Sequence, residues 1–224
     1  QEVAEPWNGG HGDWNANAAR IIQQQLGGHL FLYHDWSHLG FGQYREGVAI
    51  LSRFPFLYTE ARYVSANHDV YDIHARKVVM AQINAPGMGL VNIFSAHLSW
   101  WSDGFCEQFD ALRAWADEKH HYSTAATILC GDFNIKAGSE GYEHVVNTSD
   151  FEDQCLKVTN RPSFDRIFAR PASAKMQELD GDGRIDYIFV KRGSKLEPVA
   201  ARRLFTETAY GRVSDHEGYL ITFE

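Results

Sequence analysis

The chain has 224 residues, of which 44% are hydrophobic and 22% charged, which suits one globular domain with a substantial core. We therefore expect residues 1–224 to form a single domain, and no apolar run is long enough to span a bilayer, which argues against a membrane partner. The formal net charge of −8 makes nucleic acid a less favoured partner than a small molecule, because binding a phosphate backbone usually requires a basic face.

The predicted elements alternate irregularly between helix and strand. Residues 15–26 are predicted to form a helix, because apolar side chains such as Ile21 and Leu26 recur on one face. Residues 105–119 show the same period, and residues 139–146 form a shorter helix. Apolar runs predict strands at 29–33, 47–52, 75–83, 90–98, 185–190, 197–204 and 219–223. The order of elements predicts two packed sheets flanked by helices.

Two turns are predicted between strands. Pro86-Gly87-Met88-Gly89 is typical of a hairpin turn, and Asp180-Gly181-Asp182-Gly183 is interpreted as a turn that leads into the strand at 185–190. The second turn imitates a calcium loop, but Phe189 stands where an EF-hand requires a bidentate Glu.

The three cysteines, Cys106, Cys130 and Cys155, have neither the number nor the spacing of a disulfide framework or a cysteine-based zinc site. Their use predicts a reducing compartment, and hence a cytoplasmic protein.

Three polar motifs adjoin predicted strands in the second half of the chain. Gly131-Asp132-Phe133-Asn134 follows an apolar run, Asp186 lies within one, and Ser214-Asp215-His216 precedes one. Polar groups at strand ends are held on a rigid support, where active sites tend to be built. Each motif alone is an ordinary turn, since Asp and Asn favour turns, but three together indicate one site.

These residue types suit hydrolysis at phosphorus. A phosphate ester is surrounded by negative oxygens, and a hard cation such as Mg²⁺, held by carboxylates and water, neutralises them. Asp132 and Asp215 are candidate ligands or bases, and Asn134 can hold the attacking water. His216 can donate to a phosphoryl oxygen if a carboxylate orients its ring, and Asp186 is the candidate partner.

In these motifs the chain resembles the endonuclease/exonuclease/phosphatase (DNase I-like) superfamily. Further similar segments are Gln1-Glu2-Val3, residues 46–55 (EGVAILSRFP) and residues 92–98 (NIFSAHL). The resemblance implies an α+β fold, a four-layer α/β sandwich of two packed, mostly antiparallel β-sheets flanked by helices. It spans nearly the whole chain.

The same resemblance implies roles for individual residues. Glu2 and Asp215 would hold Mg²⁺, with Mn²⁺ as a substitute, and His97 would protonate the leaving oxygen. The residues it implies for catalysis are His97, Asp132, Asn134, Asp186 and His216.

Four residues are candidates for substrate binding. Arg76 would touch the scissile phosphate, or simply cover a strand edge, and Glu46 would contact the metal shell or the substrate. One of Trp100 and Trp101 is expected in the core, while the other could stack on a sugar ring. Residues 33–40 and 97–101, together with Glu46, resemble the bacterial subgroup that contains maltose 6'-phosphate phosphatase.

The chain departs from the superfamily pattern at its start. Members have a strand before Gln-Glu that carries an Asn of the metal site, whereas Gln1 is the first residue here. We therefore expect an N-terminally truncated domain with the first strand missing, and weaker metal binding.

The motifs and the resemblance together predict a metal-dependent phosphoesterase, and in particular a phosphomonoesterase for a small phosphorylated compound such as a sugar phosphate. Two alternatives stay open. One is a phosphodiesterase, either a nuclease of DNA or RNA or a sphingomyelinase-like enzyme. The other is a catalytically inactive binding module that keeps the fold.

Overall fold

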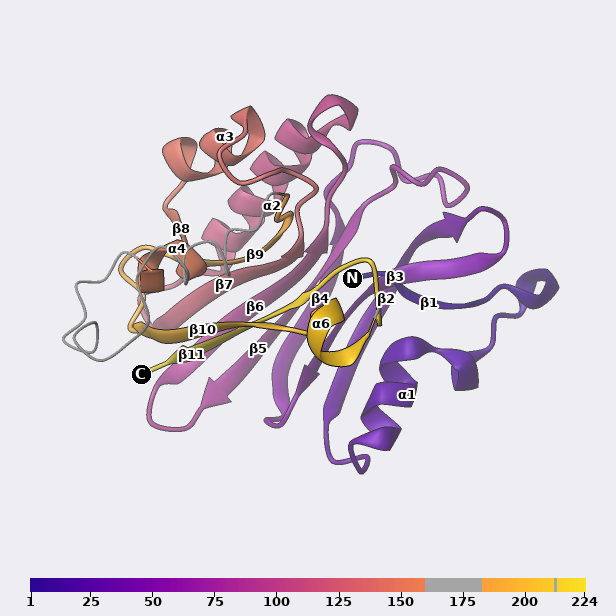
Figure 1. Cartoon of the computed structure of the whole chain (residues 1–224), viewed down its shortest axis with the longest axis horizontal. Coiled ribbons are helices and arrows are strands. Elements are labelled where there is room, and N and C mark those ends of the chain that lie inside the picture. Colours follow the sequence, from indigo (N-terminus) through magenta and orange to yellow (C-terminus); the bar gives the residue numbers. More distant parts are fainter. Residues whose placement is uncertain (160–182, 212) are drawn as a thin grey trace.

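A six-stranded sheet forms the centre of the computed structural model, which describes residues 1–159, 183–211 and 213–224 (Figure 1). Only its β6–β7 pair is parallel, and its other neighbours run antiparallel. Its strands, in spatial order, are β4 (Phe56–Tyr63), β5 (Lys77–Ala85), β6 (Gly89–His97), β7 (Thr124–Asp132), β9 (Asp186–Lys191) and β8 (Phe151–Asp153).

Two smaller antiparallel sheets form the second β layer. One has the order β1 (Val3–Pro6), β3 (Tyr44–Ser52), β2 (Phe31–Gly40), and the other pairs β10 (Pro198–Leu204) with β11 (Gly218–Phe223). Val48 and Ile50 of β3 pack on Val79 of β5, while Phe223 packs in a cluster that includes Val190. Both small sheets therefore bury apolar side chains against the same large sheet.

Helices cover the opposite face of the large sheet. The principal ones are α2 (Phe105–Lys119) and α3 (Glu140–Thr148), seen together along the upper edge of Figure 1. Phe105, Phe109 and Leu112 of α2 are fully buried against Phe94 and Phe189 of the sheet. Smaller helical segments are η1 (Asn8–Gly10), η2 (Trp14–Ala16), α1 (Ala18–Gln25), η3 (Trp101–Asp103), α4 (Gln154–Thr159) and α6 (Glu207–Tyr210).

The predicted fold class is confirmed: the chain is α+β, with two packed β layers and flanking helices. The helix at 105–119 has the predicted bounds, and residues 86–89 form the predicted turn between β5 and β6. The predicted turn at 180–183 lies almost wholly outside the described residues. No helix in the described part of the chain is long and apolar enough to cross a membrane.

Two local predictions need correction. β4 was not predicted, because Phe56–Tyr63 mixes charged with apolar residues on an edge strand. The helix at 15–26 is split into η2 and α1 at Asn17, whose side chain accepts a hydrogen bond from the Arg20 amide and caps α1. Ile21 and Leu26 are exposed rather than buried on this helix.

Candidate active site

Three predicted catalytic residues lie side by side on neighbouring strands of the large sheet, at the same end of these strands. His97 ends β6 and pairs in register with Asp132, which ends the parallel strand β7. Asp132 in turn pairs with Asp186, the first residue of the antiparallel strand β9. Because α2 lies between β6 and β7 in the chain, it lets the two strands run in the same direction and end at the same edge.

The turn after β7 is fixed by its own backbone geometry. Gly131 has φ 126°, and a side chain there would collide with the Ala96 carbonyl oxygen. Asn134 has φ 51°, its backbone amide donates to Asp132 Oδ1 at 2.8 Å, and its side-chain nitrogen donates to the Leu98 carbonyl oxygen at 2.8 Å. Asn134 thus holds the Asp132 carboxylate and the β6–β7 edge, and its predicted contact with water stays a prediction.

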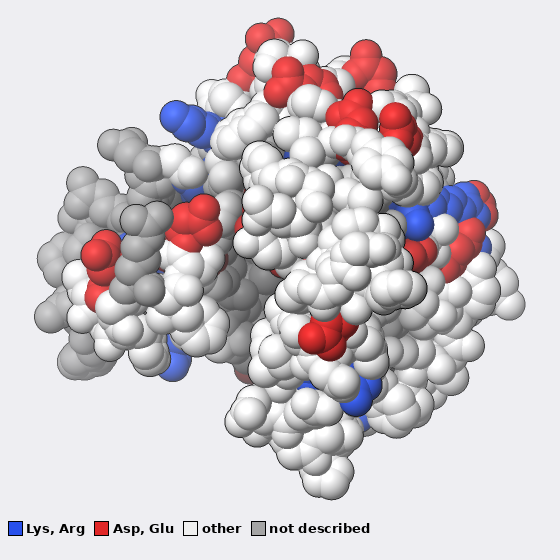
Figure 2. Space-filling view, turned by 90° about the vertical axis from the view of Figure 1, so that its right-hand side faces the viewer, with Lys and Arg blue, Asp and Glu red and all other residues white. Residues whose placement is uncertain are grey.

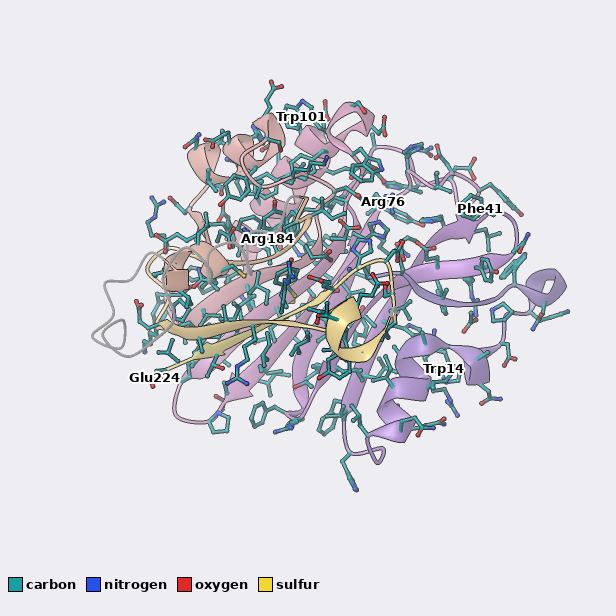
Figure 3. The ribbon with its side chains drawn as sticks, viewed as in Figure 1. Trp14, Phe41, Arg76, Trp101, Arg184 and Glu224 are labelled. Atoms are coloured by element: carbon teal, nitrogen blue, oxygen red, sulfur yellow. The ribbon has the colours of Figure 1, made fainter. Side chains whose placement is uncertain are left out.

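The start of β9 is anchored by a buried ion pair. The Arg184 side chain is fully buried and its Nη2 donates to Asp153 Oδ2 at 2.6 Å (Figure 3). Arg184 precedes Asp186 by two residues, so this pair helps to set where Asp186 begins the strand. An Arg with paired acceptors is typical of such buried anchors.

His216 and Asp186 form the pair that the motifs predict. His216 Nδ1 lies 2.7 Å from Asp186 Oδ2, and its other nitrogen, Nε2, lies 3.9 Å from Asp132 Oδ2. The other oxygen of Asp186 accepts a hydrogen bond from the Gln1 side chain at 2.5 Å. Asp186 therefore orients the imidazole so that Nε2 faces Asp132.

The surroundings shift the pKa values of Asp132 and His216. Burial and the neighbouring charge of Asp186 raise the pKa of Asp132 to about 6, although the Asn134 amide opposes the shift. Burial lowers the pKa of His216, but the hydrogen bond and charge of Asp186 outweigh it and raise this pKa above its ordinary value. A carboxyl group with a pKa near neutrality can exchange a proton at working pH, as a general base must.

His97 lies between the large sheet and the β1–β3–β2 sheet. Its Nε2 lies 3.5 Å from Asp132 Oδ2, and its Nδ1 lies 3.9 Å from Glu46 Oε1 on β3. Burial and the nearby Arg76 charge hold the pKa of His97 well below its usual range. A neutral imidazole can donate a hydrogen bond or bind a metal, and protonation of the leaving oxygen by His97 stays a prediction.

Glu2, Glu46 and His97 present donor atoms that all lie within 4.8 Å of one another. The two carboxylates suit a hard divalent cation such as Mg²⁺ or Mn²⁺, whereas an imidazole ligand is more typical of zinc, copper or iron. Burial and the charge of Glu2 raise the pKa of Glu46, so a cation between these carboxylates would relieve their repulsion. The residues present therefore fit a metal ion. Glu46, which was expected to contact the metal shell or the substrate, is one of its candidate ligands.

Asp215, the other predicted metal ligand, lies elsewhere. It is exposed, and its described side-chain contact is with the Ser214 hydroxyl at 3.3 Å. It is not in the group of close donor atoms found among the described residues. The structure thus brings Glu2 together with Glu46 rather than with Asp215.

Arg76 is a buried cation at the same site. Only 8% of the residue is exposed, and its Nε donates to Ser99 Oγ at 3.4 Å. Within the described part of the chain, no carboxylate lies within 4.0 Å of its guanidinium, although Glu46 and Asp132 are close enough to affect its pKa. Arg76 directly precedes β5 of the large sheet and is labelled in Figure 3. A buried guanidinium without a carboxylate partner can bind an anionic ligand.

The two tryptophans have different surroundings. The Trp101 ring packs 6.0 Å from the rings of Phe105 and His144, against α2 and α3. Trp100, which is 49% exposed, has no ring partner among the described aromatic contacts. The expectation that one tryptophan lies in the core is wrong, because Trp101 is also 37% exposed; it packs against the helices at the surface, and stacking of Trp100 on a ligand stays a prediction.

His38, within the predicted similar segment 33–40, also lies at this site. It is buried on β2, with Nε2 3.5 Å from Glu46 Oε1 and Nδ1 3.3 Å from the Ala75 carbonyl oxygen. Burial and the Arg76 charge lower its pKa. His38 therefore lies close to the same Glu46 oxygen as His97 does. No local motif marks it, because its partner is on another strand.

Comparison with known proteins agrees with this geometry. Residues 4–216 match the Endonuclease/Exonuclease/phosphatase family, whereas a search of curated protein sequences finds no match. A family protein from Leptotrichia buccalis has a similar structure, with TM-score 0.76 and 24% identity over 100% of this chain and 85% of that one.

Two other similar structures carry more specific names. One is a mannosyl-6-phosphatase from Bacteroides thetaiotaomicron, with TM-score 0.58 and 15% identity over 90% of this chain and 75% of that one. The other is the human Nocturnin catalytic domain with a bound sulfate anion, with TM-score 0.61 and 16% identity over 92% and 76%. At these identities both show a shared fold. With its motifs at the predicted sheet edge and the match over residues 4–216, the chain belongs to the endonuclease/exonuclease/phosphatase family.

Proposed function

We propose that the protein is a metal-dependent phosphomonoesterase that acts on a small phosphorylated compound, with a sugar phosphate as the favoured class. The observation that carries the proposal is Arg76, a buried guanidinium with no described carboxylate partner, beside the Glu2–Glu46–His97 group. A metal ion and the Arg76 guanidinium side by side would suit a phosphoryl group, which carries several anionic oxygens.

The side chains divide the reaction between them. Glu2, Glu46 and His97 would hold a divalent ion, which would neutralise charge on the phosphoryl group. Asp132, with its pKa raised to about 6, removes a proton from the attacking water. His216, held by Asp186, donates from Nε2 to a phosphoryl oxygen, and Arg76 binds another.

Two observations support a small substrate. Trp100 is half-exposed and offers an aromatic face on which a sugar ring can stack. On the face shown in Figure 2, basic side chains are scattered rather than gathered into a continuous band. A nuclease usually requires such a band to follow the phosphate backbone. The likeness to a mannosyl-6-phosphatase agrees with this choice.

Phosphate release tests the proposal directly. The protein would be assayed with hexose phosphates, nucleoside monophosphates and plasmid DNA, each with Mg²⁺ and with EDTA. We expect Mg²⁺-dependent release from a hexose phosphate, with the Asp132→Asn variant as the inactive control. Cleavage of DNA with no release from any monoester would replace this proposal with the nuclease alternative. No turnover of any substrate with Mg²⁺ or Mn²⁺ would favour the inactive module.

A further inference from the structure

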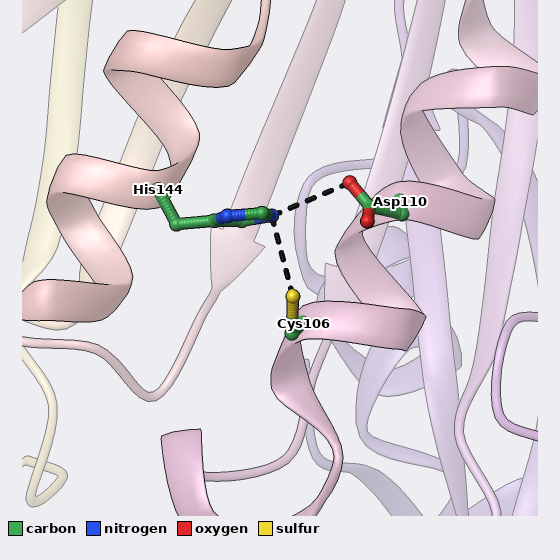
Figure 4. A group of neighbouring side chains, drawn as sticks. All are labelled: Cys106, Asp110 and His144. Carbon is green, nitrogen blue, oxygen red and sulfur yellow. Dashed lines mark hydrogen bonds and ion pairs between the residues drawn. The ribbon is translucent and has the colours of Figure 1, made fainter.

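A second group of metal-binding side chains lies outside the candidate active site, between α2 and α3 (Figure 4). Cys106 and Asp110 are one helical turn apart on α2, and His144 reaches across from α3. Cys106 Sγ lies 3.5 Å from His144 Nε2, and Asp110 Oδ1 lies 3.3 Å from the same nitrogen. All three donor atoms lie within 4.8 Å of one another.

The geometry differs from that of a nucleophilic cysteine. A Cys–His–Asp relay needs the thiol on one imidazole nitrogen and the carboxylate on the other. Here both contacts converge on Nε2, as the two dashed lines in Figure 4 show. A hydrogen on one nitrogen cannot serve both partners well, whereas a cation placed between the three atoms would contact all of them.

The two separations measured from His144 Nε2 match those in a tetrahedral zinc site. Bonds of about 2.3 Å to sulfur and about 2.0 Å to nitrogen or oxygen place S and N about 3.5 Å apart, and N and O about 3.3 Å apart. The measured separations at His144 are 3.5 Å and 3.3 Å. Thiolate, imidazole and carboxylate are also the three ligand types that zinc accepts.

The surroundings hold the imidazole in place. The rings of Trp101 and Phe109 each lie 6.0 Å from the His144 ring, on different elements. The side chain of His144 is 19% exposed and that of Asp110 is 42% exposed, so an ion could enter from solvent. Arg113 Nη2 lies 3.3 Å from Asp110 Oδ1, which orients that carboxylate toward the group.

We propose that Cys106, Asp110 and His144 form a zinc-binding site, with a water molecule in the fourth position, that clamps α2 to α3. Binding releases the thiol proton to solvent and forms bonds from zinc to the sulfur, the His144 nitrogen and the Asp110 oxygen. The site has a structural role, because its ligands face each other across two helices. The His144 ring also lies 6.0 Å from that of Trp101, the residue that follows Trp100 in the chain.

Cobalt provides the sharpest test, because Co²⁺ takes the zinc geometry and reports a thiolate ligand by its absorption. The protein, stripped with EDTA and saturated with Mg²⁺, would be titrated with Co²⁺ and then with Zn²⁺. We expect tetrahedral ligand-field bands and a thiolate-to-cobalt charge-transfer band, both abolished by Zn²⁺. The Cys106→Ser and His144→Gln variants should lose the thiolate band and bind one ion fewer.

The matched control is Glu107→Gln, which removes an exposed acid from the same turn of α2 and leaves the donor set intact. It should keep the bands and the ion count. Zinc should also raise the Tm of the original protein and of Glu107→Gln, but not that of Cys106→Ser. Absence of the thiolate band in the folded original protein, or its persistence in Cys106→Ser, would overturn the proposal. Loss of a sugar phosphatase activity leaves this test unaffected, since its readouts do not depend on catalysis.

Discussion

His216 Nδ1 lies 2.7 Å from Asp186 Oδ2, so the ring presents Nε2 to Asp132. The two residues come from different sheets, since Asp186 begins β9 and His216 precedes β11. This contact joins β9 of the large sheet to the segment that precedes β11 of the β10–β11 sheet. It also means that the position of the donor on His216 depends on a carboxylate with no direct contact to the substrate.

The first prediction concerns this pair. His216→Ala and Asp186→Asn should each lower kcat on the order of 100-fold or more, because the donor is lost in one variant and misoriented in the other. The double variant should be little slower than the slower single variant, since both changes disable one function. Steady-state kinetics on the four proteins would measure the coupling, and fully additive losses would show that the two residues act independently.

Asp132→Asn should abolish most turnover, on the order of 100-fold or more, because an amide cannot accept the proton of water. In the original protein, kcat/KM should rise as the pH increases through about 6, where Asp132 loses its proton. The measurement is a pH–rate profile at saturating Mg²⁺. A profile that is flat between about pH 5 and pH 7 would remove Asp132 from the role of base.

Asp132→Asn should lower turnover but raise the stability of the folded protein. The pKa of Asp132 is raised in the folded protein from 3.8 to about 6, so its contribution to stability is full below 3.8 and is lost as the pH rises through about 6. Relative to the original protein, metal-free Asp132→Asn should therefore gain on the order of 2 kcal/mol in free energy of unfolding between about pH 4 and pH 7. Denaturation in EDTA at both pH values checks this, and a difference that does not change with pH contradicts it.

Glu46→Gln should weaken metal binding. Removing one of two carboxylates in the Glu2–Glu46–His97 group should raise the Mg²⁺ concentration for half-maximal activity on the order of 10-fold or more. Excess Mg²⁺ should restore part of the activity. Glu140→Gln, an exposed acid on α3, is the control for the loss of charge alone. Equal metal dependence in the two variants would show that Glu46 is not a metal ligand and would favour a substrate contact instead.

The two tryptophans should behave differently when replaced by Ala. Trp100→Ala should raise the KM for a sugar phosphate more than it lowers kcat, because stacking acts in the ground and transition states alike. Trp101→Ala should instead lower the free energy of unfolding by about 1 kcal/mol or more, since its ring packs against Phe105 and His144. Kinetics and denaturation on both variants would separate the two roles, and the reverse pattern would exchange them.

Sequence patterns predicted the parts of the fold and site that depend on local order. Asp132 and Asp186 are predicted because each ends or begins an apolar strand, whereas the role of His97 is implied by the family resemblance; the sheet places all three in register. The pairing of His216 with Asp186 followed from the need for an orienting carboxylate.

Other features depend on contacts between distant strands and helices. Glu46 lies near Glu2 because β1 pairs with β3, and near His97 because the β1–β3–β2 sheet packs on the large sheet, and neither its own motif nor its neighbours indicate this. His38 joins this group through a partner on the adjacent strand β3. The Cys106–Asp110–His144 group was missed because 34 residues separate Asp110 from His144, so no short motif contains all three.

The central claim is that the site is built for a phosphomonoester. The most direct test compares kcat/KM for a hexose phosphate with kcat/KM for the methyl diester of the same phosphate, both at saturating Mg²⁺. The pair differs only at phosphorus, so sugar contacts through Trp100 are the same in both. The account predicts that the monoester is turned over on the order of 100-fold faster, because Arg76 and the metal group can neutralise its second charge. Faster turnover of the diester would contradict the account and identify the protein as a phosphodiesterase.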